Sequence, residues 1–220
     1  MCPRQMEKAV AVELPQAVNY YVNDIFYTLQ GEGVRAGTPA VFLRFQGCNL
    51  KCNIEAGPLS PGGFACDTEF NSGRAMGSQE VVDAVVAAAG TCRWVVMTGG
   101  EPGLQVDRRL VEMLHEAGFK LAIETNGTRP VDKLGLDWVT LSPKVAEHAV
   151  VVEKADEVKY VRAYGQGIPR PQAKADHHLI SPAFHGGTLD QRTLDWCVRL
   201  CLENPKWRLS LQLHQLVGIK

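Results

Sequence analysis

A chain of 220 residues, 45% of them hydrophobic and 21% charged, has the size and composition of one globular α/β domain. Its formal net charge of −1 provides no basic field for nucleic acid, and no apolar run approaches the roughly 18 residues that a membrane span needs. Its seven cysteines, odd in number and unevenly spread, argue against a disulfide framework. We therefore expect a cytoplasmic protein that contacts neither nucleic acid nor membrane.

The chain begins with a predicted extension and a predicted strand. Residues 1–18 lack the apolar core of a signal peptide, so we interpret them as an N-terminal extension and residues 19–220 as a single domain. Val22–Tyr27 predicts a short strand, and Thr28–Gly33 (TLQGEG) follows it. The two glycines of this loop let backbone approach a ligand closely, although a plain turn would have the same spacing.

The next predicted strand carries a charged residue. The apolar run Ala40–Phe45 predicts a buried strand that ends at Gly47, and Arg44 lies within it. An arginine in an apolar strand is rarely buried without a partner. It therefore belongs to an edge position, to a structural ion pair, or to a site for a carboxylate, whose shape the guanidinium matches.

Three cysteines follow this strand: Cys48, Cys52 and Cys66. Thiolate sulfur suits both iron–sulfur clusters and zinc. Three thiolates, in place of four, leave one coordination position of a metal centre open for chemistry. A structural zinc site would need a fourth ligand, for which His177 or His178 would be a candidate.

Beyond the cysteines, predicted strands alternate with helices or loops. Helices are expected at Ser78–Ala89, Asp107–Ala117 and Leu189–Leu202. Further strands are expected at Cys92–Met97, Lys120–Glu124, Trp138–Leu141, Ala155–Val161, His177–Ile180 and Trp207–Leu213. Roughly six core strands with about three helices predict an α/β fold, an open, partial βα barrel with reduced helical content. On the last helix, Cys197 and Cys201 are expected to be core residues, a second metal site being the alternative.

Four short segments together resemble the radical S-adenosylmethionine (SAM) enzymes and, among them, the 7-carboxy-7-deazaguanine synthase family. They are TLQGEG, CNLKC…CDT around the cysteines, TGGEP at Thr98–Pro102 and SPK at Ser142–Lys144. The resemblance spans residues 22–220 and implies the partial barrel of the radical SAM type. The usual cysteine spacing is C-x3-C-x2-C, whereas here thirteen residues, Asn53–Ala65, occupy the second gap, and we interpret them as an inserted loop.

The resemblance implies three cofactors. Cys48, Cys52 and Cys66 would hold a [4Fe–4S] cluster that leaves one iron open to SAM. Thr68 would ligate Mg²⁺, a cation that prefers oxygen ligands. The residues implied to contact SAM are Ala65, Cys66, Asp67, Gly100, Glu101, Ser142, Pro143, Lys144, Ser181 and Pro182.

The implied substrate is a carboxylated pterin. The residues implied to contact it are Leu29, Gln30, Gly31, Arg44, Thr98 and, through its terminal carboxylate, Lys220. The implied reaction converts 6-carboxy-5,6,7,8-tetrahydropterin to 7-carboxy-7-deazaguanine and ammonia by a Mg²⁺-assisted radical ring contraction, within 7-deazapurine (queuosine) biosynthesis. The radical would derive from SAM, so no side chain is expected to act as the catalytic residue.

The resemblance also implies partners, namely an electron donor such as flavodoxin or ferredoxin and a second copy of the chain in a homodimer. Two alternatives remain open. One is another small radical SAM enzyme, such as an activase that makes a glycyl radical on a partner protein. Such an enzyme should lack TLQGEG and the threonine after the third cysteine. The other alternative is a noncatalytic iron–sulfur or zinc protein.

Overall fold

The computed structural model describes residues 19–51, 66 and 68–220. Its strands are β1 (Asn19–Leu29), β2 (Pro39–Phe45), β3 (Arg74–Gly77), β4 (Trp94–Gly99), β5 (Lys120–Thr125), β6 (Trp138–Leu141), β7 (Lys154–Arg162), β8 (Lys174–Pro182), β9 (Phe184–His185), β10 (Thr188–Leu189) and β11 (Trp207–Leu209). Its helices are α1 (Ser78–Ala89), α2 (Arg108–Glu116), α3 (Gln191–Glu203) and α4 (Leu213–Val217), with 3₁₀ turns η2 (Pro102–Leu104) and η3 (Glu147–Ala149). None of the helices in these ranges is long and apolar enough to cross a membrane.

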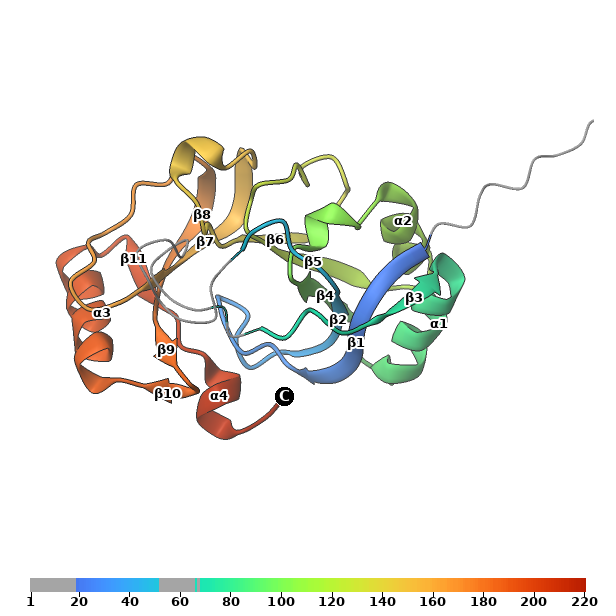
Figure 1. The fold of residues 1–220 in the computed structure, drawn as a ribbon, viewed down its shortest axis with the longest axis horizontal. Helices are drawn as coiled ribbons and strands as arrows, with labels where there is room; N and C mark the ends of the chain where they lie inside the picture. Colours follow the sequence, from blue (N-terminus) through green and yellow to red (C-terminus); the bar gives the residue numbers. More distant parts are fainter. Residues whose placement is uncertain (1–18, 52–65, 67) are drawn as a thin grey trace, which may run out of the picture.

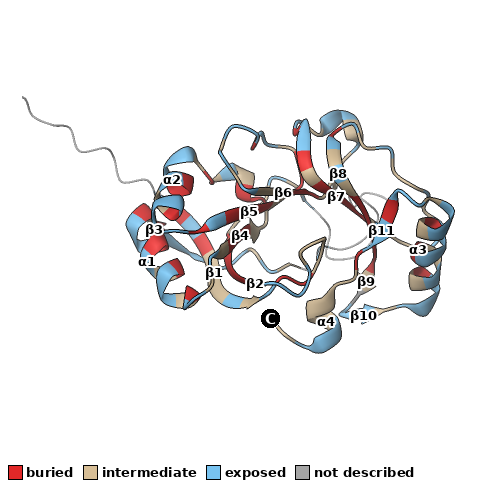
Figure 2. Ribbon diagram, turned by 180° about the vertical axis from the view of Figure 1, so that it is seen from behind, coloured by how far each residue is buried: buried red, intermediate tan, exposed pale blue. Residues whose placement is uncertain are grey.

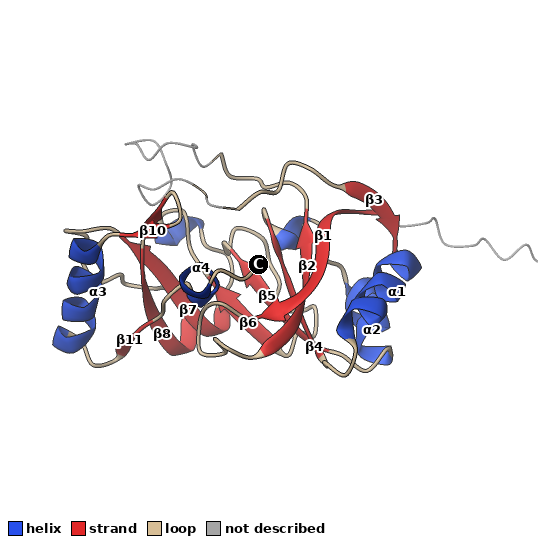
Figure 3. Cartoon of the chain, turned by 90° about the horizontal axis from the view of Figure 1, so that it is seen from below, coloured by secondary structure: helices blue, strands red, loops and turns tan. Residues whose placement is uncertain are grey.

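Nine of these strands form one open, mixed sheet in the order β11-β8-β7-β6-β5-β4-β2-β1-β3. From β2 to β11 neighbouring strands are parallel, while β1 is antiparallel to both β2 and β3. The sheet curves around a central space, and its edge strands β11 and β3 do not pair with each other (Figure 1; Figure 3). The predicted open, partial βα barrel with few helices is therefore confirmed.

Helices cover the outside of the sheet at its two ends (Figure 1). Helices α1 and α2 pack beside β1, β2 and β5, and α3 packs on β8 and β11. Figure 2 shows buried stretches within these helices. Their buried apolar residues recur with helical spacing and include Val81, Val82, Val85, Leu110, Val111, Leu114, Cys197 and Leu200. Cys197 is fully buried and Cys201 packs against the same core, so the core interpretation of this pair is confirmed.

The central strands β2, β4 and β5 bury both of their faces. Their outer side chains join the main core: Val41, Leu43, Phe45, Val95, Met97, Leu121 and Ile123. Their inner side chains form a second, smaller cluster: Ala40, Phe42, Val96 and Ala122. Successive side chains of a strand point to opposite faces, so nearly continuous apolar runs are what a doubly covered parallel sheet requires.

The C-terminal region differs from the prediction. The strand expected at Trp207–Leu213 ends at Leu209, and residues from Leu213 form helix α4 instead. The Ser210 N–H makes the last hydrogen bond toward β8, to the Ile180 carbonyl (2.8 Å). The Leu213 N–H then bonds to the carbonyl of Gly31 (2.8 Å), so a tertiary contact with the TLQGEG loop ends the strand pattern.

Candidate active site

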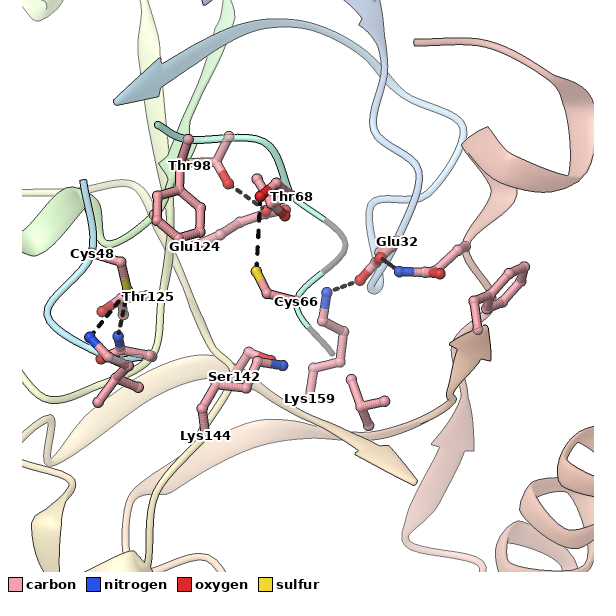
Figure 4. Close-up of a pocket in the computed structure, with 18 of the residues that line it drawn as sticks. Glu32, Cys48, Cys66, Thr68, Thr98, Glu124, Thr125, Ser142, Lys144 and Lys159 are labelled. Atoms are coloured by element: carbon pink, nitrogen blue, oxygen red, sulfur yellow. Dashed lines mark hydrogen bonds and ion pairs between the residues drawn. The ribbon is translucent and has the colours of Figure 1, made fainter. Parts of the chain in front are cut away.

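A layer of polar side chains lies on the inner face of the barrel, toward the C-terminal ends of the strands. Arg44 of β2 is in register with Thr98 of β4, and Glu124 lies on β5 two residues beyond the buried Ala122. The period of two along each strand places these side chains next to the inner apolar cluster. The Thr98 hydroxyl donates to Glu124 Oε2 (3.0 Å), as Figure 4 shows. In βα barrels this rim is where active sites are built.

Two adjoining cavities open at this rim. The cysteine cavity, of about 190 Å³, includes Cys48, Cys66, Ser142 and Lys144 in its wall. The loop cavity, of about 710 Å³, lies against the TLQGEG loop and the C-terminal segment, and its volume is typical of small-molecule sites. Residues that line both cavities are Glu32, Cys66, Thr68, Thr98, Glu124, Phe184 and Gln212.

Two of the three predicted cluster ligands face the cysteine cavity. Cys48 follows β2, and Cys66 lies across the cavity beside Thr68 (Figure 4). Burial raises the pKa of the Cys48 thiol, and the charges of Glu101 and Cys66 raise it further, so its thiolate needs a nearby cation. Cys52, the third predicted ligand, lies outside the described residues.

The histidines of the zinc alternative lie elsewhere in the barrel. The His177 ring stacks on Trp138 at a centroid distance of 6.1 Å, and the His178 ring meets Trp207 edge to face at 5.2 Å. Neither lines the cavity that contains Cys48 and Cys66. Within residues 19–51, 66 and 68–220, no group of three His, Cys, Asp or Glu side chains is arranged to hold a metal ion.

The two glycines of TGGEP bring this segment against the cysteine loop. Gly99 has a φ of +131°, and a Cβ there would overlap the Phe45 backbone. A Cβ at Gly100 would overlap the Gly47 carbonyl. That carbonyl accepts a hydrogen bond from the Glu101 N–H (2.9 Å), so the segment fixes the backbone next to Cys48.

Glu101 lies beneath the cysteine cavity and does not line it. Its side chain is fully buried, and Oε1 accepts from the Thr125 hydroxyl (2.7 Å) and the Gly103 N–H (2.8 Å). Oε2 accepts from the Asn126 N–H (2.7 Å). Burial raises the pKa of Glu101, while these hydrogen bonds favour its ionised form. Its carboxylate therefore braces the loops after β4 and β5.

The residues predicted to contact SAM divide into three groups. Those that line the cysteine cavity are Cys66, Gly100, Ser142, Lys144 and Pro182. Those that do not line it are Glu101, Pro143 and Ser181, of which Ser181 is buried within β8. Ala65 and Asp67 lie outside the described part of the chain. The Lys144 ammonium donates to the Ser142 hydroxyl (3.1 Å), so the SPK segment presents a paired polar edge to the cavity.

All six residues predicted to contact the substrate line the loop cavity: Leu29, Gln30, Gly31, Arg44, Thr98 and Lys220. The Gln30 amide donates to Glu124 Oε1 (2.9 Å), which ties the loop to β5. Burial raises the pKa of Glu124. Thr68, the predicted Mg²⁺ ligand, lies at the boundary of both cavities.

Arg44 lines the loop cavity and has an unsatisfied donor atom. Its Nε atom is buried and makes no hydrogen bond to the part of the chain that the structure describes. Its guanidinium lies 5.2 Å from the centre of the Phe26 ring, which covers one face of the group. A buried donor without an acceptor is costly. The guanidinium of a residue that lines a cavity is also suited to bind the carboxylate of a ligand.

The C-terminal residue reaches the same cavity. The backbone carbonyl oxygen of Lys220 accepts from the Thr28 hydroxyl (2.9 Å), and the Lys220 ammonium forms an ion pair with Asp24. A Cβ at Gly31 would overlap the His214 ring, so the glycine allows the tail to pack directly on the TLQGEG loop.

Glu69 fastens the segment that follows Thr68. Its Oε1 accepts from the N–H groups of Asn71 (2.8 Å) and Ser72 (3.0 Å). Its Oε2 accepts from the Asn23 amide (2.6 Å) and the Ser72 hydroxyl (2.8 Å). These hydrogen bonds, that of the Ser72 backbone foremost, lower the pKa of Glu69 to about 2.

We expect the Glu69→Gln variant to be less stable than the wild type at neutral pH, by an amount that shrinks in acid. The ionised carboxylate stabilises the fold fully above its ordinary pKa of 4.5, and the effect disappears as the pH falls toward about 2. Urea unfolding of the cluster-free proteins, followed by circular dichroism between pH 7 and 3, measures the difference. Glu153→Gln, at an exposed position, is the control. A difference that stays constant with pH would contradict the assignment.

Sequence reasoning did not select Glu32, Lys159 or Gln212, although all three line the cysteine cavity. The signal for Lys159 was present, because Glu157 and Lys159 put charges at alternate positions of an otherwise apolar strand. No local sequence pattern indicated that Gln212 would line a cavity, because it lies within the strand expected at Trp207–Leu213.

No protein-family model matches this chain. A 7-carboxy-7-deazaguanine synthase from Bacteroides thetaiotaomicron is 43% identical over 200 residues, which cover 90% of this chain and 98% of the relative. One from Burkholderia multivorans is 43% identical over 92% of this chain and 100% of its own length. Among solved structures, the crystal structure of QueE from Escherichia coli matches with a TM-score of 0.67 and 28% identity, over 89% of this chain and 95% of that chain. Likeness over nearly the full length of these relatives shows that the chain belongs to the 7-carboxy-7-deazaguanine synthase family.

Proposed function

We propose that the chain is a radical SAM enzyme that converts 6-carboxy-5,6,7,8-tetrahydropterin to 7-carboxy-7-deazaguanine and ammonia, in 7-deazapurine (queuosine) biosynthesis. One observation carries the proposal. The six residues expected to contact the pterin line one cavity, and that cavity shares its wall with the one that contains Cys48 and Cys66. Substrate and cofactor would therefore meet across a common boundary.

The donor set fits the proposed cofactors. Cys48 and Cys66 are free thiols that face one cavity, and with Cys52 they would hold a [4Fe–4S] cluster. Once reduced, such a cluster supplies the electron for the reductive cleavage of SAM. Gly100, Ser142 and Lys144 would hold SAM through backbone and polar groups. The Thr68 hydroxyl would serve Mg²⁺ together with a substrate carboxylate.

The protein would contribute placement of the pterin and exclusion of water. Arg44 would bind the substrate carboxylate, since it lines the loop cavity and a guanidinium matches the shape of a carboxylate. The linked side chains of Gln30, Glu124 and Thr98 would meet the donors and acceptors of the ring. Burial of this set strengthens each polar contact in the closed site.

The family resemblance supports further proposals about the setting of the enzyme. Residues 19–220 would act as a single domain in the cytoplasm. The cluster would take electrons from flavodoxin or ferredoxin, and two copies of the chain would form a homodimer. The reaction itself requires no contact with nucleic acid or membrane.

Product analysis after anaerobic turnover tests the proposal. The reconstituted protein should bind about four irons per chain. With SAM, Mg²⁺ and the carboxylated tetrahydropterin it should release 7-carboxy-7-deazaguanine. SAM cleavage without the deazaguanine product would favour a glycyl-radical activase. Bound zinc with no spectral response to SAM would favour a noncatalytic protein.

A further inference from the structure

A buried ion pair lies where the two cavities meet. Lys159 of β7 pairs with Glu32 of the TLQGEG loop, and their side chains are only 9% and 14% exposed (Figure 4). The Gln212 amide also donates to Glu32, at Oε1 (2.8 Å). Glu32 and Gln212 line both cavities, whereas Lys159 lines the cysteine cavity.

These contacts join distant parts of the chain across the open side of the barrel. Glu32 follows β1, which lies near one edge of the sheet, and Gln212 follows β11 at the other edge. Two further hydrogen bonds run alongside, from the Gly33 N–H to the Ser210 hydroxyl (2.9 Å) and from the Leu213 N–H to the Gly31 carbonyl (2.8 Å). The TLQGEG loop, β7 and the C-terminal segment are thus connected by an ion pair and hydrogen bonds on this side of the barrel.

The buried ion pair stabilises this contact only while both Lys159 and Glu32 are charged. Among the described residues, Glu32 is the carboxylate that pairs with Lys159. Removing one member of a buried pair leaves the other charge without compensation, whereas replacing both by neutral groups is far less damaging. Loss of Lys159 would therefore leave the Glu32 carboxylate without its cationic partner and held by the Gln212 amide, and would loosen the adjacent backbone of Gln30 and Gly31.

We propose that Lys159 is a positioning residue for the pterin, because its ion pair with Glu32 holds the TLQGEG loop as a wall of the loop cavity. This inference rests on the proposed function for the identity of the substrate. The competing role is direct contact with SAM, since Lys159 lines the cysteine cavity. If Lys159 positions the loop, its loss weakens binding of the pterin, and loss of Glu32 does the same. If Lys159 contacts SAM directly, its loss weakens binding of SAM, and loss of Glu32 does not.

The test compares Lys159→Met, Glu32→Gln and the double variant in the reconstituted holoenzyme. Lys154→Met, at the exposed start of the same strand, is the matched control. We expect each single variant to raise the KM for the carboxylated tetrahydropterin about tenfold, with the KM for SAM within about twofold of the wild type. The double variant should be no worse than either single variant, since all three lose the same interaction.

Hydrogen exchange gives a second readout that does not depend on turnover. Backbone amides of Gln30–Val34 should exchange faster in Lys159→Met than in the wild type, and at the wild-type rate in Lys154→Met. Lys159→Arg, which keeps the charge, should restore slow exchange and pterin KM in large part.

Three outcomes would overturn the inference. The first is a rise in the KM for SAM with Lys159→Met that Glu32→Gln does not share. The second is an unchanged pterin KM in both single variants. The third is unchanged exchange of the loop amides. If the wild type cleaves SAM but forms no deazaguanine product, the proposed function fails, and the exchange experiment still decides whether the ion pair holds the loop.

Discussion

Replacing Cys66 with alanine should abolish assembly of the iron–sulfur cluster. Cys66 lines the cysteine cavity opposite Cys48, and no other described cysteine besides these two lines it, so the variant removes one of the three thiolates on which the cluster depends. The measurement is iron content and visible absorption after anaerobic reconstitution. We expect the wild-type absorption to be absent in the variant, while circular dichroism shows that the fold is retained.

Cys197→Ala is the matched control for that experiment. Cys197 is a fully buried core residue of α3, and burial raises the pKa of its thiol to about 11. A neutral core thiol of this kind is a poor metal ligand, so the control should bind iron as the wild type does. Equal loss of iron in both variants would show that the assignment of the ligands is wrong.

Arg44→Met should cause the largest loss of substrate affinity among the residues of the loop cavity. Truncating one partner of a buried, hydrogen-bonded charge pair costs about 3 kcal/mol, which corresponds to roughly a 100-fold rise in the KM for the pterin. Methionine fills a similar volume beside Phe26, so the barrel should still fold. Arg44→Lys should recover only part of the affinity, because an ammonium lacks the two-pronged geometry of the guanidinium.

A substrate analogue provides the sharpest control for Arg44. Tetrahydropterin without the 6-carboxylate should bind the wild type and Arg44→Met equally, in a competition assay against the substrate. Arg208→Met, at an exposed position of β11, should match the wild type with both compounds. If Arg44→Met weakened both compounds to the same extent, Arg44 would shape the cavity without binding the carboxylate.

The part of the site that sequence reasoning found lies at the C-terminal ends of parallel strands. Arg44 and Thr98 lie near the C-terminal ends of continuous apolar runs that predict buried parallel strands, and such strands bring their ends to one rim. The family resemblance implied the other four substrate residues, Leu29, Gln30, Gly31 and Lys220, and all six line one cavity. The roles of these residues remain predictions that the variants above would test.

The direction in which a side chain points depends on tertiary packing, which a short motif does not show. Glu101 belongs to a motif that predicts ligand contact, yet its carboxylate bonds to Thr125 and Asn126 beneath the cavity. A buried carboxylate bonds to whichever donors surround it, and those donors come from the loop after another strand. Tertiary packing also ends β11 earlier than predicted, because the Leu213 N–H donates a hydrogen bond to the Gly31 carbonyl.

The amino-acid sequence by itself determined the strand pattern and the place of Cys48 after β2, and its likeness to a known family indicated the residues that meet at the loop cavity. These follow from local periodicity and short motifs. Tertiary structure alone decided that the open side of the barrel is spanned by the TLQGEG loop and the C-terminal segment, held by Lys159, Glu32 and Gln212. The physical reason is that a buried ion pair forms between groups far apart in the chain only after the sheet has brought them together, so no local pattern encodes it.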